Sequence, residues 1–255
     1  MTDILSAAEV VDEAARHARE IPQFTQSGPL GVTEAYAIQA RSVARRLARG
    51  ERLVGVKMGL TSRAKMAQVG VDEVIWGRLT DAMRLEEGAS LSHAKYVHPR
   101  IEPELAFLLK KPIEGEMTAP EALACVEGIA PAMEIIDSRY RDFKFALPDV
   151  IADNSSSSGF VIGPWSSPAT RFANLGLSLE VDGRPVEIGS TSAILGDPIR
   201  SLVAAARLAA PALGGLKAGW IILAGGATAA HSLKIGESVR LTMQGLGSVS
   251  IKVGA

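Results

Sequence analysis

The sequence predicts an α+β protein with a helical N-terminal region over residues 1–75 and a mostly antiparallel or mixed β domain over residues 76–255. Three observations lead to this prediction. The first fifty residues carry helix signals, strand-like apolar runs begin near Glu102, and one alternating segment contains a strong hairpin turn. With 255 residues, of which 47% are hydrophobic, the chain can bury a sizeable core.

Two helices are expected at the N-terminus. Ser6 and Glu9 have the spacing of a capping box, in which each side chain bonds to the backbone N–H of the other residue. Residues 33–49 are rich in alanine and arginine, and Gly50 follows them. Because glycine commonly ends helices, this pattern predicts a long helix that stops at Gly50.

The middle of the chain changes from helix signals to strand signals. A short apolar run at residues 53–60 precedes a predicted helix over residues 62–70. From Glu102 onward we expect the sheet, with one helical interruption at residues 120–128. The strand-like runs of this part are residues 105–109, 132–136 and 159–162.

The C-terminal third predicts a hairpin, a helix and further strands. Apolar residues alternate with polar ones on both sides of Asp182-Gly183, a two-residue turn that is typical of antiparallel hairpins. Asp197 and Pro198 fit an N-cap followed by proline at the first helical position, so a helix is expected to run to about Ala210. The remaining predicted strands are residues 220–223, 238–243 and 248–253.

Charge and hydropathy exclude several classes of function. The chain has 27 Lys plus Arg against 28 Asp plus Glu, so it has no net positive field that would attract nucleic acid. The most apolar run, residues 218–230, is shorter than the roughly 18 residues that a membrane span needs. The N-terminus is acidic and lacks a signal-peptide core, so we expect a cytoplasmic protein.

Three glutamates form the strongest candidate for a chemical site. Glu102 and Glu104 flank Pro103, and residues two apart on a strand point to the same face of a sheet. Glu134 lies inside an apolar run, where an unpaired carboxylate would be costly unless a cation compensates it. A set of three carboxylates suits Mg²⁺ or Mn²⁺ rather than zinc. The alternative is that Glu102 and Glu104 form surface ion pairs and that Glu134 bonds a buried lysine.

Three other segments contain residue types that could bind a ligand. Lys57 ends an apolar run and is followed by a turn rich in glycine and hydroxyl groups, which could present backbone N–H groups to an anion. Such a lysine could stabilise an enolate or move a proton, or could simply be solvated. Residues 153–159 resemble a polar binding loop, and Gly225-Gly226 would allow a close backbone approach. Both segments could equally be ordinary turns.

Six ordered motifs resemble the family of 2-hydroxypentadienoate hydratases and 4-oxalocrotonate decarboxylases of bacterial aromatic catabolism. That family shares a fold with the C-terminal domain of fumarylacetoacetate hydrolase, so the resemblance implies this fold. The resemblance spans nearly the whole chain. The motifs are VGVKMGLTSRAKMAQVGV at 54–71, WGRLTDAM at 76–83, HPRIEPELAF at 98–107, MEIIDSRY at 133–140, ADNSSS at 152–157 and GLGSVS at 245–250.

The resemblance also implies roles for individual residues. The metal ligands would be Glu102, Glu104 and Glu134, with Mg²⁺ or Mn²⁺ as the cofactor. Lys57 and Asp81 would be catalytic, with Asp81 orienting Lys57 or relaying a proton. The residues expected to bind substrate are Leu60, Thr61, Ser62, Arg63, Arg139, Ser155 and Ser156. Arg63 and Arg139 are the candidates for holding a distal carboxylate.

Within the family, the sequence of residues 57–83 and 137–145 resembles the decarboxylase branch more than the hydratase branch. The implied reaction is metal-dependent decarboxylation of 4-oxalocrotonate (2-oxohex-3-enedioate) to 2-hydroxypenta-2,4-dienoate and CO₂. The alternative is a hydratase that converts 2-hydroxypentadienoate to 4-hydroxy-2-oxopentanoate. A third hypothesis, from a different class, is a non-catalytic scaffold that binds a sister hydratase. We expect the chain to form a homo-oligomer and to form a complex with that hydratase.

Overall fold

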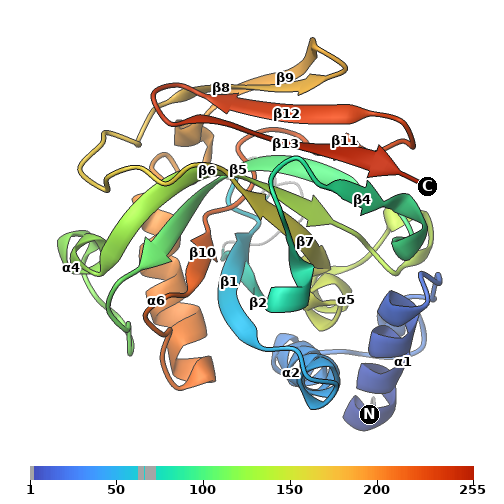
Figure 1. Ribbon diagram of the computed structural model, residues 1–255. Coiled ribbons are helices and arrows are strands. Elements are labelled where there is room, and N and C mark those ends of the chain that lie inside the picture. Colours follow the sequence, from blue (N-terminus) through green and yellow to red (C-terminus); the bar gives the residue numbers. More distant parts are fainter. Residues whose placement is uncertain (1–2, 63–65, 67–72) are drawn as a thin grey trace.

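The computed structural model describes residues 3–62, 66 and 73–255, and it confirms the predicted α+β fold. Two helices, α1 (Ile4–Arg16) and α2 (Val32–Ala48), precede the sheets and lie side by side (Figure 1). Helix α2 lies close to its expected position. The expected capping box at Ser6 is wrong, because α1 begins earlier and the side chain of Asp3 accepts a hydrogen bond from the N–H of Leu5.

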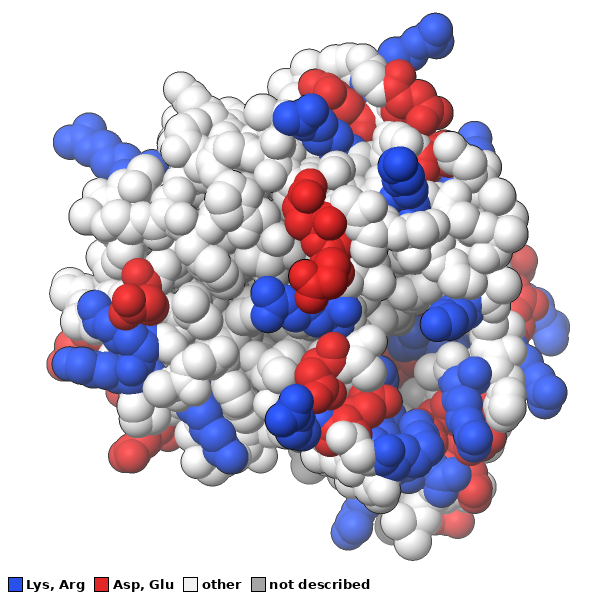
Figure 2. All heavy atoms as spheres, in the orientation of Figure 1, with Lys and Arg blue, Asp and Glu red and all other residues white. Residues whose placement is uncertain are grey.

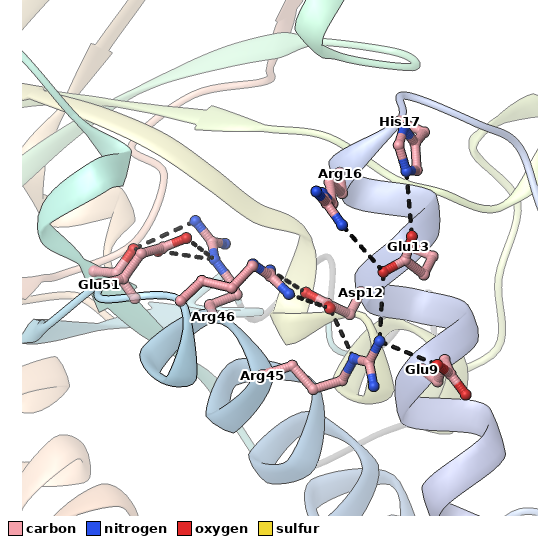
Figure 3. A network of polar contacts seen from close by, with 10 residues as sticks. Glu9, Asp12, Glu13, Arg16, His17, Arg45, Arg46 and Glu51 are labelled. Carbon is pink, nitrogen blue, oxygen red and sulfur yellow. Dashed lines mark hydrogen bonds and ion pairs between the residues drawn. The ribbon is translucent and has the colours of Figure 1, made fainter.

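An ion-pair network joins the two N-terminal helices (Figure 3). Asp12 of α1 is buried, and its carboxylate receives hydrogen bonds from Arg45 at 2.8 Å and from Arg49 at 2.6 and 2.7 Å. At the end of α2, Arg46 pairs with Glu51 at 3.0 Å. A buried carboxylate with two arginine partners fixes the pairing of the helices, because removal of those partners would leave a desolvated charge.

The larger of the two described sheets contains eight strands and is mixed. Its order is β2-β1-β10-β5-β6-β7-β3, and β11 pairs with β5. Strand β1 runs parallel to β10, β3 runs parallel to β7, and the other pairs are antiparallel. The strands are β1 (Leu53–Gly59), β2 (Ile75–Thr80), β3 (Arg84–Leu85), β5 (Arg100–Leu109), β6 (Val126–Ile136), β7 (Ser157–Ile162), β10 (Ile221–Leu223) and β11 (His231–Ser232).

The second sheet has five described strands in the order β4-β13-β12-β8-β9. They are β4 (Ser90–Ser92), β8 (Gly176–Val181), β9 (Arg184–Ser190), β12 (Ser238–Met243) and β13 (Gly247–Gly254). The predicted hairpin is β8 and β9, and its turn residues Asp182 and Gly183 have φ values of +51° and +76°. Two positive φ values match the twist of a two-residue hairpin turn.

The sheet begins earlier than the sequence indicated. Strands β1 to β4 all precede Glu102, and β1 is buried inside the large sheet between β2 and β10. A short buried strand has no polar alternation, so its apolar run could not be distinguished from other buried segments. Helix α4 (Ala119–Ala124) is also shorter than expected, because residues from Val126 onward belong to β6.

Helix α5 (Leu147–Ala152) leads into the polar loop before β7, and α6 (Ile199–Leu213) packs against α4 and the sheet. Helix α6 confirms the predicted one and ends at Gly214, which has a φ of +66°. The predicted helix over residues 62–70 lies almost entirely outside the described residues. The helical N-terminal part ends at Ala48, and the expected domain boundary at residue 75 stays a prediction.

The buried core fills the space between the two sheets and beneath α6, and a smaller core lies under α1, α2 and α5. Acidic and basic side chains are interspersed over the face of the molecule that Figure 2 shows, as the near-zero net charge predicts. Within the part of the chain that the structure describes, every helix is too short or too polar to cross a membrane.

Candidate metal centre and substrate cavity

Glu102 and Glu134 lie directly opposite each other on neighbouring strands. The register of β5 and β6 pairs Glu102 with Glu134, and Glu104 follows on the same face of β5. Ligand atoms of the three carboxylates lie within 4.8 Å of one another. Like charges that face each other across an antiparallel pair are destabilising, so this register requires a compensating positive charge.

Burial makes that requirement stronger. Glu104 and Glu134 are both fully buried, and one carboxylate oxygen of each, Oε1, has no hydrogen-bond partner among the described residues. Burial raises the pKa of Glu104 well above its ordinary range, and the charge of Glu134 raises it further. Burial also raises the pKa of Glu134, although Lys57 opposes the shift. Buried carboxylate oxygens without hydrogen-bond partners are suited to bind a cation.

Lys57 supplies part of the positive charge. It lies on β1, and its ammonium nitrogen is 2.9 Å from Oε2 of Glu134, with 5% of the side chain exposed. Burial alone would lower the pKa of Lys57, but the carboxylates of Glu134, Glu104 and Glu102 raise it above its ordinary value. Lys57 is therefore a protonated ammonium group. When all three carboxylates are ionised, as metal ligands are, one such charge leaves a net charge of −2, which suits a divalent cation.

Gly225 and Gly226 bring their backbone against the carboxylates. The N–H of Gly225 donates a 2.7 Å hydrogen bond to Oε2 of Glu104. A β-carbon at Gly226 would lie 2.7 Å from Oε2 of Glu102, so glycine lets the backbone approach that carboxylate in its present position. The close backbone approach that Gly225-Gly226 suggested in the sequence is confirmed, and it fixes two of the three glutamates.

The three glutamates fit a divalent ion. Within the part of the chain that the structure describes, they supply oxygen ligands only, at least two of their oxygens have no protein partner, and no histidine or thiolate joins the cluster. This donor set is the one that Mg²⁺ or Mn²⁺ prefers, and it leaves coordination positions for water or a ligand.

A cavity of about 700 Å³ opens beside this cluster. Lys57 and Glu102 line its polar end, together with the backbone at Gly226. Most of its wall is apolar, and is formed by Met58, Leu60, Ile75, Ile136, Phe143, Phe145 and Val150. Leu60, Thr61 and Ser62, which were expected to bind substrate, line this cavity as well. A small organic acid could therefore reach the glutamates through a largely apolar space.

The polar loop between α5 and β7 forms another wall of the cavity. The side chain of Asn154 donates to the carbonyl of Arg78 at 2.9 Å and accepts from its N–H at 2.8 Å, as a paired strand would. These bonds hold Asn154, Ser155 and Ser156 at φ values of +50° to +61°. The hydroxyl of Ser155 donates to the carbonyl of Trp76 at 2.8 Å, whereas Oγ of Ser156 is buried without a partner among the described residues. Of these two serines, Ser156 is the one whose hydroxyl is not bonded to another described residue.

Asp81 does not lie beside Lys57, contrary to the role expected for it. Lys57 pairs with Gly77 in the middle of β2, while Asp81 follows the far end of that strand. Its carboxylate accepts hydrogen bonds from the backbone and side chain of Arg52, each at 2.9 Å, and these bonds lower its pKa. Because four residues of extended strand separate the two positions, about 13 Å of β2 lies between them. Asp81 is a surface residue that fixes the start of β1.

Arg139 does not line the cavity either. It is buried against Asp153, with 2.5 Å between Nε and Oδ1 of the carboxylate, and it also donates to the carbonyl of Asp153 and to Oγ of Ser158. It borders a separate cavity of about 270 Å³ against α1 and α2. Its N–H groups are therefore committed to the protein. Arg63, the other candidate for a distal carboxylate, lies outside the described residues.

Arg100 lines the cavity and was not singled out from the sequence. It lies on β5 two residues before Glu102, and its guanidinium carbon is 3.8 Å from the centre of the Phe143 ring. The sequence spacing did indicate this position, because the two-residue period of a strand places Arg100 on the same face as Glu102 and Glu104. Phe143 and Phe145 carried no comparable signal, because they reach the cavity from a loop distant in sequence.

An all-carboxylate cluster beside a protonated lysine, at the polar end of an apolar cavity, defines a divalent-metal site for a small organic acid. Residues 54–254 match the fumarylacetoacetate (FAA) hydrolase C-terminal family, and the chain belongs to that family. The match covers both sheets and all the residues of the cluster.

Individual relatives are similar over nearly their whole length. The chain is 59% identical over 243 residues to a 4-oxalocrotonate decarboxylase of Pseudomonas sp., covering 95% of each chain. It is 34% identical over 247 residues to a 2-keto-4-pentenoate hydratase of Paraburkholderia xenovorans (strain LB400), covering 95% of this chain and 92% of the relative. A solved structure of 4-oxalocrotonate decarboxylase from Pseudomonas putida G7, complexed with magnesium and adipate, superposes with a TM-score of 0.95. That chain is 37% identical, and the match covers 98% of this chain and 97% of the other.

Proposed function

We propose that this protein is a lyase that decarboxylates 4-oxalocrotonate to 2-hydroxypenta-2,4-dienoate and CO₂, with Mg²⁺ or Mn²⁺ as its cofactor, in the catabolism of aromatic compounds. The observation that carries the proposal is the buried cluster of Glu102, Glu104 and Glu134 with Lys57 at the end of an apolar cavity. The 59% identity to a 4-oxalocrotonate decarboxylase supports this reaction over others of the family.

Glu102, Glu104 and Glu134 would hold the divalent ion. When bound, such an ion supplies a Lewis acid that draws negative charge toward the 2-oxo group of a substrate. The site of this chain thus favours acids that carry an oxygen next to the carboxylate. The N–H of Gly225 keeps Glu104 in place, so the ligand geometry does not depend on the ion alone.

The reaction breaks the C5–C6 bond of 2-oxohex-3-enedioate. The electron pair of that bond forms the C4–C5 double bond, the C3–C4 double bond moves to C2–C3, and the C2 oxygen becomes an oxyanion. CO₂ leaves, and one proton on the oxygen completes 2-hydroxypenta-2,4-dienoate. Lys57 is the ammonium group at the polar end of the cavity, and it stabilises the oxyanion as charge develops there.

A hydratase is the alternative, since relatives such as the hydratase of Paraburkholderia xenovorans are 34% identical over most of the chain. The test is to incubate the Mg²⁺-loaded protein with 4-oxalocrotonate and to follow CO₂ together with the absorbance of the dienol. Release of both supports the decarboxylase. If the protein releases no CO₂ but converts 2-hydroxypentadienoate to 4-hydroxy-2-oxopentanoate, its reaction is that of a hydratase. The proposed metal ligands would stay the same.

The proposal includes assembly into a homo-oligomer and a complex with a hydratase that accepts the dienol product. The edge strand β9 supports a protein contact, because Val186 and Ile188 expose 41% and 79% of their surface on it. Light scattering of the purified protein alone measures its oligomeric state, and light scattering of its mixture with the hydratase measures formation of the complex. A monomer that does not bind the hydratase would contradict this part of the proposal.

A further inference from the structure

Arg100 is a cation in the cavity beside the three glutamates, and its guanidinium lies over the ring of Phe143. Of the described residues that line the cavity, only Lys57 and Arg100 are positively charged. Lys57 is paired with Glu134. Among the described residues no carboxylate forms an ion pair with Arg100, and the side chain is half-buried. A guanidinium without a counterion in a largely apolar cavity is the kind of group that binds an anionic ligand.

The loop around Phe143 holds this guanidinium in place. Its carbon lies 3.8 Å from the centre of the Phe143 ring, and that ring packs against Phe145 with 5.7 Å between the ring centres. The backbone at Asp142 and Phe143 has φ values of +59° and +57°, which non-glycine residues seldom adopt. A guanidinium that lies over a ring uses its face for that contact and keeps its edge N–H groups free for a carboxylate.

The position of Arg100 along β5 fits a dicarboxylic acid. Arg100 and Glu102 point to the same face of the strand, and same-face neighbours are about 7 Å apart. A 2-oxo acid whose C1 end lies at Glu102 would extend along this face. Its far end would then approach Arg100, which lines the same cavity.

We propose that Arg100 binds the distal carboxylate of a 2-oxo dicarboxylic acid and that Phe143 positions Arg100 for this contact. The inference rests on the proposed function for the identity of the acid. It also assigns Arg100 to binding rather than to the chemical step. A contact with the carboxylate that leaves as CO₂ stabilises the ground state at least as much as the transition state, so it lowers KM without raising kcat.

The first test compares two acids with the same chelating end. 2-Oxoadipate and 2-oxohexanoate differ only in the distal carboxylate, and calorimetry measures their affinities for the Mg²⁺-loaded protein. We expect the wild-type protein to prefer 2-oxoadipate by about 10- to 100-fold, the usual effect of one charge-assisted hydrogen bond. Arg100→Leu should abolish the preference. If the preference survives in Arg100→Leu, the inference is wrong.

Two sets of variants separate binding from structural damage. Arg141→Leu removes a nearby arginine that is 69% exposed and lies 3.8 Å from Glu20, so it should keep the full preference. Phe143→Tyr keeps the ring and should keep the preference, whereas Phe143→Leu should lose part of it. If Arg100→Leu has a lower melting temperature than the wild-type protein, the binding comparison is repeated with Arg100→Gln, which keeps a polar side chain. Equal losses in Arg141→Leu and Arg100→Leu would overturn the assignment.

Turnover separates this inference from the proposed reaction. With 4-oxalocrotonate, Arg100→Leu should raise KM about 10- to 100-fold and lower kcat less than about threefold. A large fall in kcat at an unchanged KM would overturn the binding role. If the wild-type protein shows the Arg100-dependent preference but releases no CO₂, the proposed decarboxylation is wrong. The proposed binding of a distal carboxylate by Arg100 then still holds. If CO₂ is released and Arg100→Leu changes nothing, only the Arg100 inference fails.

Discussion

The ammonium nitrogen of Lys57 lies 2.9 Å from Oε2 of Glu134, and both side chains are almost fully shielded from water. The alternative considered from the sequence, that Glu134 bonds a buried lysine, is therefore present together with the carboxylate cluster. The two interpretations do not compete. One lysine neutralises one of three carboxylates, and the other two, when ionised, suit a divalent cation.

Lys57→Met should lower kcat by about 100-fold or more and change KM for 4-oxalocrotonate much less. An ammonium beside the 2-oxo group interacts more strongly with the developing oxyanion than with the neutral ketone. Steady-state kinetics at saturating Mg²⁺ measure this. The variant should also bind Mg²⁺ more tightly, since the site gains one net negative charge. An unchanged kcat with a raised KM would show that Lys57 only holds the substrate carboxylate.

Removal of the metal should make stability depend on pH in a defined direction. Burial and Glu134 raise the pKa of Glu104 above its ordinary value of 4.5, so the folded metal-free protein prefers the protonated form. This preference stabilises the fold fully below pH 4.5 and is lost as the pH rises through the higher folded-state pKa. The melting temperature of the metal-free protein should fall over that window. Mg²⁺ at 100 times its Kd should restore about 2.7 kcal/mol at neutral pH.

Glu104→Gln is the variant that tests the source of this pH dependence. The amide is uncharged at every pH, so the metal-free variant should lose the fall in melting temperature, and Mg²⁺ should no longer stabilise it. Glu114→Gln, at an exposed position, is the matched control and should behave as the wild-type protein. A Glu104→Gln protein that Mg²⁺ still stabilises fully would remove Glu104 from the ligand set.

Gly226→Ala should weaken Mg²⁺ binding without unfolding the protein. The new β-carbon would lie 2.7 Å from Oε2 of Glu102, so the carboxylate must move, and a flexible side chain can do so at little cost to the fold. We expect the Kd for Mg²⁺ to rise at least about tenfold, the size of effect seen when the orientation of a metal ligand is disturbed. Titration calorimetry measures it. Gly115→Ala, where the added carbon meets no atom within 4 Å, is the control.

Features that depend on local sequence were predicted well. The hairpin at Asp182-Gly183 and helix α2 follow from short-range turn and capping chemistry, and the structure confirms both. Glu102 and Glu104 were placed on one strand face by their spacing alone. The opposition of Glu102 to Glu134 was beyond sequence reasoning, because register between β5 and β6 depends on how the connection through α4 closes.

The structure places Asp81 and Arg139 away from the positions expected for them because of contacts between distant residues. Asp81 belongs to a motif near Lys57 in sequence, but the antiparallel pairing of β1 and β2 carries it to the far end of both strands. Arg139 follows Glu134 closely, yet a buried carboxylate fourteen residues later binds its guanidinium. Charge type indicates that an arginine could hold an anion, whereas only the packed structure shows which anion is nearest.

Removal of either Arg139 or Asp153 should damage stability rather than substrate binding. Arg139→Met would leave Asp153 buried without its partner, and Asp153→Leu would do the same to Arg139. Breaking one side of a buried ion pair costs about 3–5 kcal/mol, while replacing both sides by apolar groups is often neutral. Each single variant should therefore unfold at much lower denaturant concentration than the wild-type protein, and the double variant should recover most of the loss. Below their melting temperatures all three should keep the wild-type KM for 4-oxalocrotonate. A stable Arg139→Met protein with a strongly raised KM would instead show that Arg139 contacts the substrate, and this would contradict the position of Arg139 in the structure.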